Sequence, residues 1–144
     1  MTARAFFPRR HAPTGRRGVA ALEFALLAPL FLTLVLGGVF YGLYMVTTIA
    51  VMQVAADGAR AAVAGLTTAE RTSLAQAAAT TSLAAYASLL SPSLTTITTQ
   101  VVPGNARLFQ VQVTYNFLAS GFPALLPLPA SNPVATDVVS MGGY

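Results

Sequence analysis

The chain contains no cysteine, and only 8% of its 144 residues are charged. Without cysteine it has no disulfide, no thiolate nucleophile and no cysteine metal site, so an exported part must be held together by packing or by partners. The only histidine is His11, and the four acids are dispersed along the chain. The sequence shows no nucleophile motif, phosphate-binding loop or metal-spaced cluster, so we expect neither an enzyme nor a bound cofactor.

Charge is also missing from the long apolar run of residues 24–56. As a helix this run would be about 50 Å long, at about 1.5 Å per residue. The hydrocarbon core of a bilayer is only about 30 Å thick. The sequence therefore predicts one membrane span with an extension, and two spans do not fit.

The charges that are present divide into two regions. Residues 1–18 hold no acid and five arginines, namely Arg4, Arg9, Arg10, Arg16 and Arg17, whereas three arginines and four acids follow Gly18. Positive flanks of a span stay in the cytoplasm. Arg9, Arg10, Arg16 and Arg17 thus form a topology signal that places the N-terminus in the cytoplasm and the C-terminal region in the periplasm. A DNA-binding arm is the competing interpretation, and we expect no nucleic acid partner.

Glu23 lies at the start of the apolar run, where a carboxylate is costly and indicates a function. If the chain were cut after Gly18, the five arginines of residues 1–18 would be removed as a leader. The cut would create a free amine on Val19, one helical turn before Glu23. Pairing of the amine with the carboxylate would make the burial of both charges tolerable. Within one helix the pair would neutralise itself, whereas between helices it would set the axial register of neighbouring subunits.

Two other interpretations of this junction exist. Gly18 could simply be a helix-breaking residue that precedes the first helix. A secretory signal peptide would also have a basic region followed by an apolar one. Against a signal peptide, Glu23 interrupts the apolar start, the run far exceeds about 7–15 residues, and no small-x-small cleavage site closes it.

The first helix should cover residues 19–64, with a kink at Pro29. Gly38 and Gly42 have the spacing of a helix-packing face. Beyond the membrane the helix should be amphipathic. Its expected polar stripe is Gln53, Asp57 and Arg60, and its expected apolar face, for packing on the chain's own C-terminal region or on other subunits, is Ile49, Met52, Ala56, Ala59 and Val63.

Gly65 should end this helix, because glycine is common just beyond a helix C-terminus. A second helix is expected within residues 65–92. It should begin at the capping box Thr67-x-x-Glu70 and run to about Leu90, with Leu83, Tyr86 and Leu90 on one face. Ser91-Pro92 should stop it.

Residues 93–144 should form a small exported β-rich region. Residues 94–102 and 107–117 read as strands joined by a turn at 103–105, and Phe109, Val111, Val113, Tyr115 and Phe117 alternate with polar residues. The proline-rich segment 119–133 is predicted to be an apolar loop that caps the core or touches a membrane or partner. Residues 134–141 could supply a third strand, and 142–144 a loose end. The predicted fold class is α+β and pilin-like: a long N-terminal transmembrane helix that continues as an amphipathic helix, a second helix, and a small antiparallel sheet.

Three segments carry a resemblance to a known family. They are residues 16–30 (RRGVAALEFALLAPL), residues 57–62 (DGARAA) and the alternation of Val111, Val113, Tyr115 and Phe117. Together they resemble a TadE-like minor pseudopilin of the tight-adherence (Flp pilus) system, over residues 16–141. Flp-type pilins typically show Glu-Tyr where this chain has Glu23 and Phe24, so Phe24 keeps the aromatic ring and loses the hydroxyl.

The resemblance implies a bacterial inner-membrane protein whose basic leader, residues 1–18, is cut by a prepilin peptidase between Gly18 and Val19. The mature chain would help to assemble a pilus for adhesion and surface attachment. Its partners would be the inner membrane, the peptidase, other pilin and pseudopilin subunits and the Tad assembly machinery. Glu23 and Phe24 would serve assembly pairing between helices. The alternative is an uncleaved single-pass inner-membrane protein with an exported partner-binding domain, which leaves Glu23 unexplained.

Overall fold

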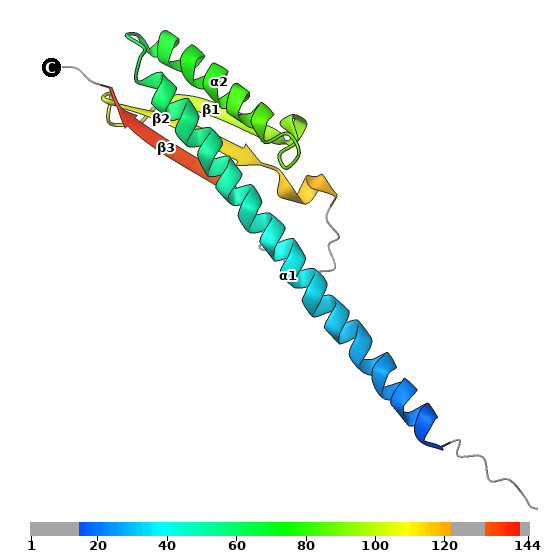
Figure 1. Cartoon of the computed structure of the whole chain (residues 1–144). Coiled ribbons are helices and arrows are strands. Elements are labelled where there is room, and N and C mark those ends of the chain that lie inside the picture. The colour runs from blue at the N-terminus through cyan, green and yellow to red at the C-terminus, as the bar shows by residue number, and fades with distance from the viewer. Residues whose placement is uncertain (1–14, 122–131, 142–144) are drawn as a thin grey trace, which may run out of the picture. The chain divides into compact units, whose positions relative to one another are not determined.

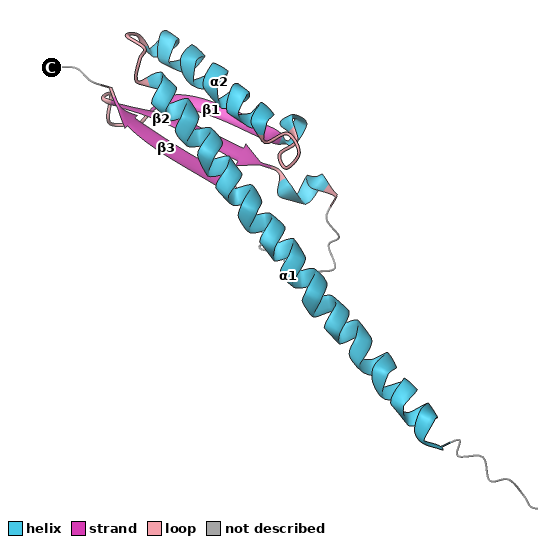
Figure 2. Cartoon of the chain, in the orientation of Figure 1, coloured by secondary structure: helices cyan, strands magenta, loops and turns pink. Residues whose placement is uncertain are grey.

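The structure, a computed structural model, describes residues 15–121 and 132–141 and confirms the α+β fold class (Figures 1 and 2). A long helix and a second helix precede a three-stranded antiparallel sheet. The elements are α1 (Gly15–Ala62), α2 (Thr68–Ala85), a 3₁₀ turn (Pro92–Leu94), β1 (Thr95–Val101), β2 (Leu108–Tyr115), a second 3₁₀ turn (Phe117–Ser120) and β3 (Val134–Ser140). The chain divides into two compact units, residues 1–36 and 37–144, which are described separately.

The first unit contains the N-terminal part of α1, and its apolar side chains are exposed. Leu22, Phe31 and Leu34 each leave about two thirds of their surface uncovered. The helix runs unbroken through Pro29, and the Thr33 hydroxyl donates a hydrogen bond to the Pro29 carbonyl at 2.8 Å. The kink at Pro29 stays a prediction. In the described part of the chain, one helix is long and apolar enough to cross a membrane, over Gly18–Ala62.

Helix α2 begins with the predicted capping box. The Glu70 amide donates to the Thr67 hydroxyl at 3.2 Å, and the Glu70 carboxylate accepts from the Leu66 and Thr67 amides at 2.9 and 3.2 Å. The backbone hydrogen bonds from Leu66 and then Thr67 stabilise the charged form and lower the pKa of Glu70. The helix ends at Ala85, earlier than predicted, because Tyr86 leaves the helical conformation.

Gly65 has a different role from the predicted one. Helix α1 already ends at Ala62, and the backbone of Gly65 does not adopt the left-handed conformation of a glycine cap. A Cβ at this position would instead lie 2.7 Å from the Arg71 amide nitrogen. Glycine is therefore required for close approach to the start of α2.

The sheet has the order β1-β2-β3, with Ile97 opposite Val113 and Val113 opposite Ala135. The predicted alternation in β2 is confirmed, since Phe109, Val111, Val113 and Tyr115 are buried. Strand β2 ends at Tyr115, and the buried Phe117 belongs to the following 3₁₀ turn. The third strand, left uncertain by the sequence, is present as β3.

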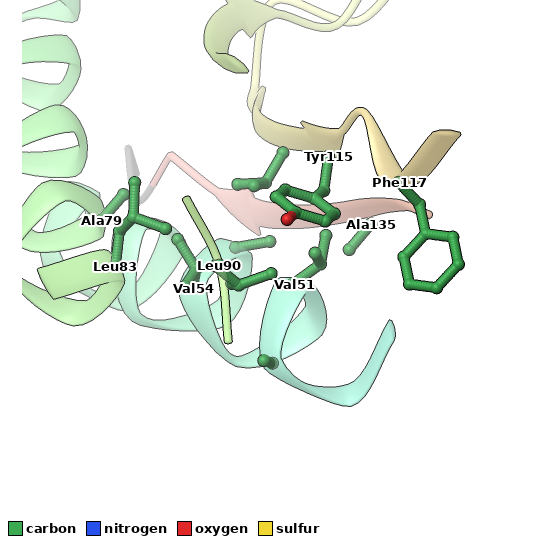
Figure 3. Packing of buried hydrophobic residues seen from close by; sticks show 11 residues of the cluster. Val51, Val54, Ala79, Leu83, Leu90, Tyr115, Phe117 and Ala135 are labelled. Atoms are coloured by element: carbon green, nitrogen blue, oxygen red, sulfur yellow. The ribbon is translucent and has the colours of Figure 1, made fainter. Parts of the chain in front are cut away.

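Helices α1 and α2 cover one face of this sheet, and the core lies between the layers (Figures 1 and 3). The largest cluster joins α1, α2 and the sheet, and its labelled members are Val51, Val54, Ala79, Leu83, Leu90, Tyr115, Phe117 and Ala135. The Phe117 ring also meets Tyr44 edge to face, with 5.3 Å between ring centroids. Leu83 and Leu90 are buried and Tyr86 is partly buried, as predicted.

The predicted apolar face of α1 beyond the membrane-spanning part is only partly the face that packs on the chain's own sheet, since Ala59 is buried there. Ile49, Met52 and Val63 are more than half exposed. The buried face is formed mostly by small residues and two valines, namely Ala50, Val51, Val54, Ala55, Gly58, Ala59 and Ala62. Small side chains let α1 approach α2 and β2 closely, and a Cβ on Gly58 would lie only 3.1 Å from the Ala75 carbonyl oxygen. Close packing here outweighs the greater hydrophobicity of the larger residues.

Most of the proline-rich loop that was predicted to cap the core, residues 122–131, lies outside the described residues. The predicted loose end, 142–144, and leader residues 1–14 also lie outside them.

Candidate processing and assembly site

Gly18 lies in the first turn of α1, which begins at Gly15. Amides in the first turn of a helix have no acceptor within the helix. Glycine is also less favourable than alanine inside a helix, by about 1 kcal/mol. A Cβ placed on Gly18 would meet no atom within 4 Å. The backbone at the predicted cleavage site is therefore open to approach, and its helical conformation is easily lost.

Val19 and Glu23 lie one turn apart on α1, and both side chains are exposed. Their spacing of four residues places them on the same side of the helix. Among the described residues, no cation lies within ion-pair distance of the Glu23 carboxylate. The ion pair that the described residues form joins Asp57 and Arg60, farther along the chain. The site therefore presents a carboxylate that is available to a group outside this helix.

Phe24 borders a shallow apolar depression on the same helix. The depression has a volume of about 550 Å³ and is lined by Phe24, Leu27, Ala28, Phe31 and Leu32. The small Ala28 lies between large side chains, which makes a socket for a side chain of a neighbouring helix. Phe24 itself is 73% exposed. Glu23 and this depression thus occupy adjacent positions near the start of the apolar segment.

The predicted topology residues are only partly within the structure. Arg16 and Arg17 belong to the first turn of α1, although their side chains are not described. Arg9 and Arg10 lie outside the described residues. Gly38 and Gly42 both belong to α1, and a Cβ at either position would meet nothing within 4 Å. A packing role for these two glycines stays a prediction.

Polar contacts in the second unit include two that sequence reasoning missed. The Ser82 hydroxyl donates to Asp57 at 2.7 Å and joins α2 to α1, whereas the sequence indicated only an exposed polar stripe. Arg71 is 6% exposed and donates to the Ala62 carbonyl at the end of α1, a contact that the sequence did not indicate. Neither contact has a local sequence signal, because each depends on how α2 folds back on α1.

The described residues bring together no group of three or more histidine, cysteine, aspartate or glutamate side chains that could hold a metal ion. The charged groups of the second unit are engaged in the contacts above or lie on its surface. The candidate site offers an accessible backbone at Gly18 and an exposed carboxylate at Glu23.

Comparison with known proteins places a family match on this same segment. Residues 18–60 match the family model described as TadE-like protein. The match begins at Gly18 and extends through most of α1, including Glu23, Asp57 and Gly58. Searches of curated proteins and of solved structures found no match. The resemblance predicted from the sequence is thus confirmed over residues 18–60, which are similar to TadE-like proteins.

Proposed function

We propose that this chain is a minor pseudopilin that a prepilin peptidase cleaves between Gly18 and Val19, and that then takes part in assembly of a Tad-type pilus for adhesion and surface attachment. The observation that carries the proposal is the TadE-like match, which starts at Gly18 and includes a carboxylate five residues later, at the start of the apolar run. An anchor that only holds a domain at the membrane has no need for this carboxylate.

Processing in this proposal divides the chain into a basic cytoplasmic leader, residues 1–18, and a mature chain. The mature chain comprises the transmembrane and extended helix (19–64), the second-helix region (65–92) and the exported β-rich region (93–144). The leader arginines hold the N-terminus in the cytoplasm, so the peptidase meets Gly18 at the cytoplasmic face of the membrane. The first turn of α1 unwinds there, because its amides lack helical acceptors.

Cleavage changes the electrostatics of the helix start. The new ammonium on Val19 adds to the positive end of the helix dipole. A carboxylate and an ammonium in hydrocarbon both lose hydration, and a pair compensates for that loss only when its geometry is good. Glu23 is exposed on α1 and forms no ion pair with a described residue. In the assembled state it pairs with the Val19 ammonium of a neighbouring subunit, while the depression beside Phe24 receives a side chain of that neighbour.

Complementation of a strain that lacks the gene tests the assembly role, with the cognate prepilin peptidase and Tad genes present. We expect Glu23→Ala to be cleaved normally and to yield few or no surface pili, because the pairing carboxylate is gone. Glu23→Asp keeps the charge and should retain part of the function. Phe24→Tyr, which restores the Glu-Tyr pair of Flp-type pilins, is the matched control and should assemble normally. Normal piliation with Glu23→Ala would show that the pairing proposal is wrong.

The alternative is an uncleaved single-pass inner-membrane protein with a partner-binding domain. It shares the basic flank and the single span. It differs in its response to Gly18→Ala, which should slow or block cleavage of a pseudopilin and leave an uncleaved anchor unchanged. Insertion into the membrane should be intact in both cases, because alanine favours the helix.

A further inference from the structure

Strand β3 lies at an edge of the sheet, and its hydrogen bonds show which of its backbone groups face β2 and which face outward (Figure 2). At its two ends the Tyr115 amide donates to the Pro133 carbonyl at 3.0 Å and the Met141 amide donates to the Arg107 carbonyl at 2.6 Å. Backbone groups alternate in direction along a strand, so the odd-numbered residues face β2. The N–H and C=O groups of Val134, Thr136, Val138 and Ser140 therefore point away from the sheet.

No described strand pairs with this outer edge. An open edge with a row of free donors and acceptors is a template for one more strand. The corresponding residues of β1 differ in their surroundings, because α2 packs against β1. Both outer strands thus have an edge that no described strand pairs with, and the edge of β3 borders a groove.

A groove runs between this strand and α1. It has a volume of about 410 Å³ and is lined by Met52, Gln53, Ala55 and Ala56 of α1 and by residues 134–137. A water molecule in the liquid occupies about 30 Å³, so the groove has room for a long side chain. A strand added to β3 would direct alternate side chains into it, because successive side chains point to opposite faces.

Asp137 gives the groove a negative charge. It pairs in register with Val111 and so lies on the helix-covered face of the sheet, where its neighbours along the strand are Ala135 and Val139. One carboxylate oxygen accepts the Val138 amide at 2.8 Å. No described cation forms an ion pair with it. A charge that points inward on an edge strand restricts which strands can pair there.

A second copy of β3 is disfavoured at this edge. Asp137 is the central residue of Val134–Ser140. In the antiparallel register that pairs two copies of β3 along their whole length, Asp137 would lie directly opposite the Asp137 of the second copy. Like charges directly opposite each other destabilise a strand pair. The edge therefore selects a different strand, with a positive charge at the position across from Asp137.

We propose that the β3 edge binds an extended segment of another protein, which adds a fourth strand and inserts a lysine or arginine side chain into the groove beside Asp137 and Gln53. The added backbone pairs with the outward-facing groups of Val134, Thr136 and Ser140 and with the Val138 carbonyl, because the Val138 amide donates to Asp137. Backbone hydrogen bonds supply affinity, and the cation opposite Asp137 supplies selectivity. This docking surface goes beyond the proposed processing and assembly at Glu23, and each can fail without the other.

The full chain in detergent micelles can be titrated with a fluorescent peptide of alternating threonine and valine that carries one central lysine. A matched peptide has glutamate in place of the lysine. Fluorescence anisotropy should show binding of the lysine peptide and much weaker binding of the glutamate peptide. Asp137→Asn should weaken binding of the lysine peptide roughly fivefold, the upper range for an exposed charge pair. Hydrogen exchange should show new protection of the Thr136 and Ser140 amides.

Thr136→Pro tests the backbone contribution, because it removes an outward-facing N–H and leaves the β2–β3 hydrogen bonds intact. It should abolish binding of the lysine peptide, whereas Thr136→Val, which keeps the N–H, should bind normally. Equal binding of both peptides would overturn the proposal. So would unchanged binding with Thr136→Pro, or wild-type dimers that Thr136→Pro disrupts, since a second copy would then occupy the edge. If Thr136→Pro does not fold, the proposal is tested by two comparisons of binding: the lysine peptide against the glutamate peptide, and the wild-type chain against Asp137→Asn.

Discussion

Gly58 lies where α1, α2 and the sheet approach one another closely. A Cβ on Gly58 would lie 3.1 Å from the Ala75 carbonyl oxygen, 3.2 Å from the Ala79 Cβ and 3.2 Å from a Val111 methyl carbon. One of these neighbours is backbone, which cannot rotate away. Glycine is helix-weakening by itself, so its presence here reflects the space available between three elements.

A larger side chain at this position should therefore separate the layers. We expect Gly58→Val to lower the free energy of unfolding by about 2–3 kcal/mol, the usual cost of overpacking a filled core. Thermal unfolding followed by circular dichroism in micelles measures the change. Gly42→Val is the matched control, because a Cβ there meets nothing within 4 Å. Equal effects of the two substitutions would contradict the close packing inferred at Gly58.

Residue-level prediction from the sequence succeeded where the cause was local. Thr67 and Glu70 form their capping box, because the partners are three residues apart and the geometry follows from the spacing. The environments of Arg71 and Asp137 could not be predicted in this way. Arg71 contacts a carbonyl of another helix, and the inward position of Asp137 depends on the register of β3 with β2.

At the scale of elements, the end of α1 is fixed by the start of α2. The last carbonyls of a helix lack partners within it. Arg71 supplies one, since its guanidinium donates to the Ala62 carbonyl at 3.3 Å while being 6% exposed. A cation at a helix C-terminus also interacts favourably with the helix dipole. Gly65 leaves the room that this arrangement requires, because a Cβ there would lie 2.8 Å from the Arg71 Cγ.

Removal of this guanidinium should loosen the junction of the two helices. Arg71→Ala removes one of two donors to the Ala62 carbonyl, which also accepts from the Gly65 amide at 3.2 Å, and it opens a space beside Gly65. We therefore expect a loss of about 1–2 kcal/mol in unfolding free energy. The control is Arg60→Ala, whose side chain is 74% exposed and pairs with Asp57 on the surface. That change should cost less than about 0.5 kcal/mol. Chemical denaturation of both variants checks the contrast, and comparable losses would refute the capping role.

The elements themselves could be predicted, and the packing face of α1 could not. Both helices and the hairpin follow from periodicity, capping and alternation, whereas the sequence left the third strand uncertain. The predicted face of α1 included Ile49 and Met52, which are exposed, and Ala59, which is buried beside the unpredicted Ala55. Hydrophobic periodicity measures the preference for leaving water, but it does not record how closely two helices can approach.

At the scale of the whole molecule, the proposed function requires one span with the leader in the cytoplasm and the β-rich region outside. The chain contains no cysteine, so single cysteines can report topology without background. In cells without the prepilin peptidase, Ala106→Cys, at an exposed position in the β1–β2 turn, should react with a membrane-impermeant maleimide after the outer membrane is permeabilised. Arg9→Cys should react only after lysis. The reverse pattern would contradict the orientation.

The single span could be predicted from composition alone, because a charge-free apolar run of this length is typical of a helix that crosses a bilayer. The proposed processing rests on the combination of leader, Gly18 and Glu23, and it would involve contacts with an enzyme and with other subunits.

Processing at Gly18 is tested most directly by the intact mass and N-terminal sequence of the membrane-extracted protein, expressed with and without a cognate prepilin peptidase. A pseudopilin should yield a mature chain that begins at Val19 only when the peptidase is present. A chain that still begins at Met1 beside an active peptidase would contradict the proposed processing and favour the uncleaved anchor. A cut near Ala56 would also contradict it, and would indicate a secretory signal.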